Sequence, residues 1–190
     1  MTATRTKAYQ LKIGLIGAKP PIWRRLLIAS STPLSEVHHA IQIAMGWTNS
    51  HLHQFEAGNA FYGVPDPDFG FDFHEIQDET RYKLSQLLRR EKDSITYEYD
   101  FGDSWQHKIT LEKAMFVEPE TKLPQCLKGK GACPPEDVGG LWGYYGFLEA
   151  IADPKHPEHV DCLEWVGGAF DPTALDINEI NARLLIKYDR

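Results

Sequence analysis

Two runs of alternating residues, 94–101 and 105–116, are separated only by Gly102, Asp103 and Ser104. In both runs apolar or aromatic residues recur at every second position, which is typical of strands with one buried face. A connection this short lets the two strands pair only as an antiparallel hairpin. The rest of the chain must therefore be arranged around a sheet that is at least partly antiparallel.

A second hairpin is predicted near the N-terminus. Residues 9–16 and 22–29 have strand patterns, and the glycine- and proline-containing segment 17–21 supplies the turn between them. Arg24 and Arg25 are neighbours in the second of these strands, so their side chains point to opposite faces, and we expect both on the surface.

A helix is predicted over residues 33–46. Thr32 supplies an N-cap, Pro33 stands at the first helical position, and Glu36 lies in the first turn. Apolar residues then repeat at helical spacing until Gly46, where a helix stop is expected. A strand at 51–56 follows.

Helices increase toward the C-terminus. Helical periodicity marks 82–88, 136–152, 158–165 and 175–188, whereas 58–80 is predicted to be an irregular loop with aromatic anchors or a short strand, and 119–135 is punctuated by glycine and proline. Regular alternation of strand and helix, which a doubly wound parallel sheet needs, is absent. These patterns predict a single α+β domain over residues 1–190, with helices packed on an antiparallel or mixed sheet and a helical C-terminal third.

Charge and cysteine usage restrict the function classes. The formal net charge is −7, which disfavours binding of nucleic acid. We expect no membrane span and a cytoplasmic location, because no run approaches the ~20 apolar residues of a span and no signal peptide is evident. The three cysteines, an odd number, fit reduced thiols better than a disulfide framework.

The tip of the central hairpin concentrates polar and aromatic residues. One interpretation is structural, with Gly102 at positive φ and the aspartates bonded to nearby backbone N–H groups. The functional interpretation is that Asp103 and His107 bind a ligand or metal between Trp105 and Tyr99. Because Trp105 and His107 share one strand face with aromatic neighbours, a hydrogen-bonded core histidine is the more common outcome for His107.

The segment 133–145 is the second candidate. Glu136 and Asp137 after Cys133 are typical of a helix start, where acidic groups oppose the helix dipole. An exposed Cys133 at that helix start would be a reactive thiol of lowered pKa. The glycines that follow disfavour a helix, so either close backbone packing or a bound ligand must require them.

Two histidine pairs could each offer two metal ligands. His51 and His53 share a strand face, and His156 and His159 share a helix face. No spacing of a structural zinc site or of a metalloprotease helix accompanies them, so we expect no native metal and no cofactor.

Three blocks together resemble the plasmid pRiA ORF-three-like family, named after the third open reading frame of a root-inducing plasmid of Agrobacterium. They are 99–107, 133–140, and 153–159 with 165–172, and the similarity extends to 22–25, to the helix with His38 and Ile41, and to 46–47 with 51–55. The resemblance implies an α+β, roll-like domain that occurs in plasmids and in bacterial and archaeal chromosomes, sometimes beside zinc-binding modules. It implies no established activity, and Cys162 is not part of the family pattern.

These observations favour a binding or interaction module for an unknown protein or small molecule. Its predicted recognition surface combines the hairpin 99–107 with the glycine-rich segment 133–145. The candidate residues are Tyr99, Asp100, Asp103, Trp105, His107, Cys133, Glu136, Asp137, Gly139, Gly140, Trp142 and Tyr145.

Two alternatives remain open. The first is a metal-assisted hydrolase that uses Asp100, Asp103 and His107 with Glu136 or Asp137, although no established catalytic motif is present. The second is a purely structural module, in which Trp105 and Trp142 pack in the core and Asp103 caps a helix.

Overall fold

The structure is a computed structural model that describes residues 4–65 and 75–188. One mixed sheet of eight strands runs through the molecule in the order β5-β4-β3-β6-β7-β1-β2-β8, and all pairs are antiparallel except β4 with β5. The strands are β1 (Thr6–Leu15), β2 (Trp23–Ala29), β3 (His53–Ala57), β4 (Ala60–Gly63), β5 (Ile76–Asp78), β6 (Ser94–Tyr99), β7 (Trp105–Val117) and β8 (Gln125–Lys130).

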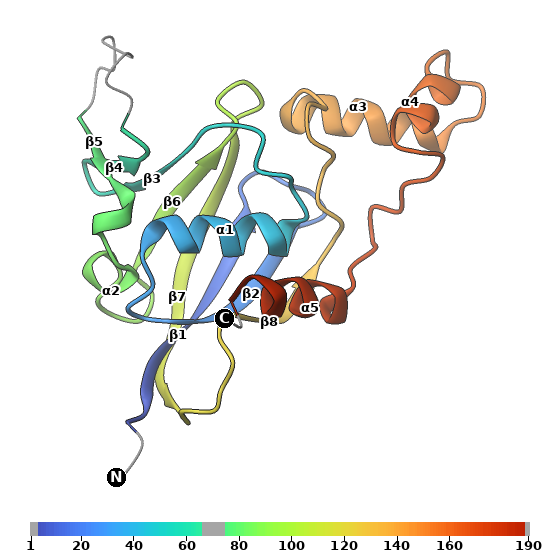
Figure 1. Cartoon of the computed structure of the whole chain (residues 1–190). Helices are drawn as coiled ribbons and strands as arrows, with labels where there is room; N and C mark the ends of the chain where they lie inside the picture. The colour runs from blue at the N-terminus through green and yellow to red at the C-terminus, as the bar shows by residue number, and fades with distance from the viewer. Residues whose placement is uncertain (1–3, 66–74, 189–190) are drawn as a thin grey trace.

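Helices cover one face of this sheet. The helical segments are α1 (Leu34–Met45), η1 (Glu79–Arg81), α2 (Leu84–Leu87), α3 (Gly140–Ala152), α4 (His159–Trp165) and α5 (Ile177–Tyr188). Figure 1 shows α1 across the sheet with α5 beside it, while α3 and α4 lie at one side of the molecule. The arrangement confirms the predicted α+β class with a mixed sheet.

Both predicted hairpins are confirmed. Strands β6 and β7 pair from Tyr99 with Trp105 to Ser94 with Thr110, and β1 pairs with β2 around the 17–21 turn. The long strand β7 also pairs with β1, so the two hairpins join into one sheet. The core lies between the covered sheet face and α1, where the alternation of β1, β2 and β7 meets the apolar face of the helix. Its members include Leu11, Ile13, Leu26, Ile28, Ile41, Ile109 and Leu111.

The helix predicted over 33–46 forms over Leu34–Met45, and Gly46 ends it at φ 104°, in the left-handed region. Pro33 occupies the N-cap position instead of the first helical position. The predicted bounds of α2, α4 and α5 agree with the structure within two residues. Helix α3 begins four residues later than predicted. Residues 66–74, which include most of the predicted aromatic anchors, lie outside the described residues.

Arg24 is expected on the surface, but it is buried. It is 2% exposed, and its guanidinium donates hydrogen bonds to the carbonyl oxygens of Ala44, Trp23 and Lys130. Burial lowers its pKa from the usual value. Arg25 faces the opposite side of the sheet and binds Glu112 through two nitrogens, at 2.6 and 2.8 Å.

No helix in the described parts of the chain combines the length and the apolar character that crossing a membrane requires.

Candidate functional site

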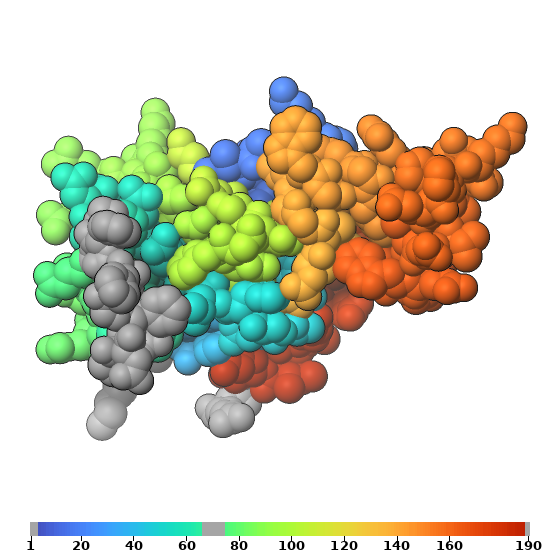
Figure 2. All heavy atoms as spheres, turned by 90° about the horizontal axis from the view of Figure 1, so that it is seen from above, coloured from blue at the N-terminus to red at the C-terminus, as the bar shows by residue number. Residues whose placement is uncertain are grey.

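Three connections that are distant in the sequence meet at one end of the sheet. They are residues 47–52 after α1, the turn 100–104 between β6 and β7, and residues 133–139 before α3. Figure 2 shows these segments, coloured cyan, yellow-green and orange, meeting on the face seen from above. We call this place the loop junction.

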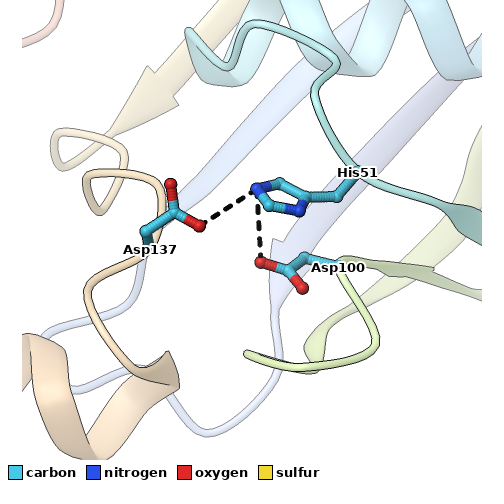
Figure 3. Close-up of side chains that lie close together, drawn as sticks. All are labelled: His51, Asp100 and Asp137. Carbon is cyan, nitrogen blue, oxygen red and sulfur yellow. Dashed lines mark ion pairs between the residues drawn. The ribbon is translucent and has the colours of Figure 1, made fainter.

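The loop junction brings together His51, Asp100 and Asp137 (Figure 3). The Nε2 atom of His51 lies 3.2 Å from Oδ1 of Asp137 and 3.7 Å from Oδ2 of Asp100. All three candidate ligand atoms lie within 4.8 Å of one another. One imidazole nitrogen and two carboxylate oxygens this close can hold a divalent cation.

The hairpin turn fixes the position of Asp100. Its φ is 58°, a left-handed conformation that aspartate tolerates better than most residues, and it is 8% exposed. Its Oδ1 atom accepts hydrogen bonds from the N–H groups of Gly102 and Asp103, at 3.0 and 3.4 Å. The Oδ2 atom therefore faces His51. The predicted bonding by an aspartate is confirmed, whereas Asp100 and Ser104, rather than Gly102, take positive φ.

Glu136 fastens two of the three connections. One carboxylate oxygen accepts a hydrogen bond from the Tyr99 hydroxyl, and the other accepts from the backbone N–H and the hydroxyl of Thr48. The Tyr99 oxygen also accepts from the N–H of Ser50 at 3.0 Å. Burial, followed by the hydrogen bond to Glu136, raises the pKa of Tyr99, so its hydroxyl stays protonated and donating.

Asp137 has a different position from its neighbour. Its side chain is 71% exposed, its φ is 60°, and its carboxylate turns toward His51. The sequence pattern predicts Glu136 and Asp137 in the first turn of a helix, but both residues precede the helix. The helix begins only at Gly140, because Asp137, Gly139 and Gly140 all take positive φ.

Asp103 joins the hairpin to α3. Its Oδ2 atom accepts a hydrogen bond from the N–H of Gly139, the N-cap residue of α3, at 3.1 Å. A Cβ atom at Gly140 would lie 2.6 Å from the carbonyl oxygen of Asp103. Close packing thus explains this glycine, and a Cβ at Gly143 would lie only 1.8 Å from the oxygen of Val138.

Trp105 and His107 do not belong to an accessible site. Both are 0% exposed, and His107 contacts the rings of Trp47 and Tyr97. Its Nδ1–H donates to the carbonyl oxygen of Trp105 at 2.9 Å. Burial lowers its pKa to about 4, so the ring is neutral near pH 7. The core interpretation of His107 is therefore confirmed, and the alternative in which Trp105 and His107 contact a ligand is corrected, because strand alternation points both side chains into the core.

Cys133 is not a reactive thiol at a helix start. Burial raises its pKa, and the helix begins seven positions later, so the helix dipole does not act on it. Trp142 is 90% exposed on α3, which contradicts its predicted place in a structural core. Tyr145 lies apart from the cluster, and its hydroxyl accepts from the N–H of Lys19 and donates to the oxygen of Gly17.

Neither predicted histidine pair forms a shared ligand set. β3 begins at His53, whose ring stacks on His38 at 3.4 Å and pairs with Glu79 at 2.8 Å, while His51 precedes the strand and turns to the loop junction. His159 is bonded to the oxygen of Ala150, and His156 accepts from the N–H of Glu158. His51 is the functional candidate that sequence reasoning did not place with the two carboxylates.

The protein thus belongs to the α+β class, with helices packed on an eight-stranded sheet and a histidine and two aspartates together at the loop junction. Residues 7–179 match the family model described as plasmid pRiA4b ORF-3-like protein. The chain belongs to the plasmid pRiA4b ORF-3-like family, as its sequence motifs indicate.

Two relatives extend this comparison. The chain is 40% identical over 176 residues to the uncharacterized protein y4hQ of Sinorhizobium fredii, with 90% of this chain and 88% of y4hQ covered. Its fold is similar to the crystal structure of MM3350 from Methanosarcina mazei Go1, a protein of unknown function. The TM-score is 0.83 at 35% identity, and the match covers 93% of this chain and 98% of MM3350.

Proposed function

We propose that this protein is a binding module whose recognition surface is the loop junction, and that its partner is a protein or a small molecule. The carrying observation is that one carboxylate, Glu136, binds Thr48 and Tyr99 and so joins its own connection to the one after α1 and to the end of β6, next to the hairpin turn. A prearranged surface binds with less loss of conformational entropy than a flexible one.

The exposed groups around the junction support the same proposal. Asp137 presents its carboxylate to solvent, and Phe101 and Trp142, at 49% and 90% exposure, stand on the hairpin turn and the first turns of α3. Exposed aromatic residues beside polar groups are typical of recognition surfaces. The net charge of −7 argues against nucleic acid as the partner.

A cytosolic location accompanies the proposal. All three cysteines, Cys126, Cys133 and Cys162, are free thiols, which suits a reducing compartment.

Site-specific photo-crosslinking tests the binding role. A benzophenone amino acid replaces Trp142 in the full chain, produced in its native host, and replaces Ile186, 80% exposed on α5, as the control position. We expect one discrete adduct from position 142, weakened by Asp137→Asn, and none from position 186. Equal adducts at both positions, or none at 142, would contradict the proposal and favour the structural module.

A hydrolase is the second candidate, and the cluster of His51 with two carboxylates favours it. His51 replaces His107 as the imidazole, because His107 is in the core, while Asp103 and Glu136 are engaged by Gly139, Tyr99 and Thr48. The test is turnover of bis(4-nitrophenyl) phosphate and 4-nitrophenyl acetate with added Zn²⁺ or Mn²⁺. Activity that is lost in His51→Ala and kept in Asp161→Asn would support hydrolysis, and absence of turnover would remove it.

A further inference from the structure

We propose that His51, Asp100 and Asp137 bind one divalent cation of the Zn²⁺ and Mn²⁺ class at the loop junction. The inference rests on the proposed function for the location of the recognition surface, and it adds the ligand at the centre of that surface. Each of the three residues comes from a different connection, so the cation would join segments that are far apart in the sequence.

The separations suit a metal. A cation about 2.0–2.2 Å from each ligand atom holds neighbouring ligand atoms about 3.0–3.6 Å apart. The Nε2 atom of His51 lies 3.2 Å from Asp137 and 3.7 Å from Asp100, and the two carboxylate oxygens lie within 4.8 Å of each other, so binding a cation requires the carboxylates to move closer together. Asp137 is the exposed member on a connecting segment and is the side chain free to make that movement.

The imidazole nitrogen at the centre of the cluster has no hydrogen-bond partner in the described part of the chain. This atom, His51 Nε2, is buried and lies 3.2 Å from Asp137. The Asp100 side chain is 11% exposed, and its Oδ2 atom faces the cluster while the turn occupies Oδ1. Figure 3 shows the two carboxylates approaching the same nitrogen from different sides.

A hydrogen bond from His51 Nε2 cannot satisfy both carboxylates. The single N–H direction of Nε2 lies in the ring plane and cannot point at both carboxylates. Asp100 is only 8% exposed, and a carboxylate in that position needs a cation or further hydrogen-bond donors to offset its burial. A dication compensates both charges and accepts the nitrogen lone pair at the same time.

The donor set selects the class of cation. Mg²⁺ and Ca²⁺ prefer oxygen ligands alone, whereas imidazole with carboxylates suits Zn²⁺, Mn²⁺ and related ions. No thiolate belongs to the cluster, which disfavours the soft Cu(I) ion. Three protein ligands leave at least one coordination position for water or for a donor atom of the partner.

The experiment measures cation binding by the full, untagged chain after chelator treatment and dialysis. Isothermal titration with Zn²⁺ and Mn²⁺ is compared with Mg²⁺, and Co²⁺ absorption identifies the ligands. We expect one Zn²⁺ or Mn²⁺ per chain, weakened about tenfold or more in His51→Gln and in Asp137→Asn. The controls Asp161→Asn and His156→Asn, both on or beside α4, should keep wild-type affinity.

Circular dichroism and melting temperature show whether each variant is folded, and the exposed position of Asp137 makes Asp137→Asn the safest test. Failure to bind Zn²⁺ or Mn²⁺ would overturn the inference, as would unchanged affinity in folded Asp137→Asn. So would a sulfur-to-cobalt charge-transfer band, which would assign the ion to a cysteine.

Failure of the cation site and failure of the recognition surface are distinguishable. Cation binding without an adduct at position 142 would support the metal site and contradict the proposed recognition surface. An adduct without cation binding would support the recognition surface and contradict the metal site.

Discussion

His107 lies at 0% exposure among aromatic rings, where Nδ1–H donates to the oxygen of Trp105 and Nε2 has no hydrogen-bond partner among the described residues. Protonation of Nε2 would place a charge in the core, near the charge of Arg24, which is why its pKa falls to about 4. His51, the same residue type, instead faces two carboxylates at the loop junction. Burial and neighbours separate the roles of these two imidazoles.

The lowered pKa of His107 predicts a pH dependence of folding. Between pH 6.5 and about 4 the unfolded chain binds a proton at this residue and the folded chain does not, so stability falls as the pH falls through that window. His107→Met should reduce the slope of unfolding free energy against pH by up to about 1.4 kcal/mol per pH unit. Urea denaturation from pH 7.5 to 5 measures it, and parallel slopes for the two proteins would contradict the prediction.

Tyr99→Phe tests the fastening of the loop junction by Glu136. The variant loses the donor to Glu136 and the acceptor for the N–H of Ser50, but it creates no cavity, so we expect a loss of about 1–2 kcal/mol in unfolding free energy. A double-mutant cycle with Glu136→Gln should give a coupling energy of at least about 0.5 kcal/mol. Purely additive effects would show that the bond contributes nothing to stability.

Residue patterns predict much of the loop junction but not its geometry. The motif blocks identify Asp100, Asp103, Glu136 and Asp137, which do meet. The sequence does not place His51 with these residues, because strand alternation assigns it to the same face as His53. The alternation does not apply to His51, since the strand begins only at His53. Long-range pairing of His51 with Asp137 has no local signal in the sequence.

The glycines of α3 have different structural roles, which substitution by alanine will separate. Gly140 has φ 67° and lies against the oxygen of Asp103, so Gly140→Ala should cost about 1–3 kcal/mol and loosen the hairpin from the helix. Gly146 has open space around its Cβ position, and Gly146→Ala should stabilise the helix by up to about 1 kcal/mol. Thermal denaturation checks both, and a stabilising Gly140→Ala would contradict the packing interpretation.

Elements with strong periodicity are predicted well, and those whose form depends on tertiary packing are not. Strand β8 lies in the segment that glycine and proline punctuate, and nothing in its alternation marks it as a strand. Its Gly129 is required by neighbours, because a Cβ there would lie 2.8 Å from Leu175 and 2.9 Å from the oxygen of Trp23. Such a contact is set by the segment that precedes α5 and by β2, and the local sequence pattern does not indicate it.

At the scale of the whole molecule, Asn181 joins α5 to the edge strand β8. Its side-chain oxygen accepts from the N–H of Cys126 at 2.7 Å, and its amide donates to the oxygen of the same residue at 3.0 Å. The side chain thus replaces a neighbouring strand at a sheet edge that would otherwise offer free backbone groups.

Asn181→Ala should lower the unfolding free energy by about 2 kcal/mol, because two backbone groups lose their partners. It should also promote self-association through the uncovered edge. Denaturation and light scattering measure the two effects, and the exposed Asn178→Ala is the matched control on the same helix. An unchanged monomer of wild-type stability would show that the edge is protected by other means.

The proposed cation predicts a stabilisation of the whole chain, because it would bind the folded loop junction and not three separated segments. At a free concentration about 100 times the dissociation constant, such a ligand adds about 2.7 kcal/mol to the unfolding free energy. Zn²⁺ or Mn²⁺ should therefore raise the melting temperature of the chelator-treated wild-type protein and of Asp161→Asn, whereas Asp137→Asn should show little change. The rise should grow with the logarithm of cation concentration, since each tenfold increase above the dissociation constant adds about 1.4 kcal/mol. Equal shifts in wild-type protein and Asp137→Asn would mean that the ion acts elsewhere, whereas a selective shift would tie the stability of the fold to the three connections that meet at the loop junction.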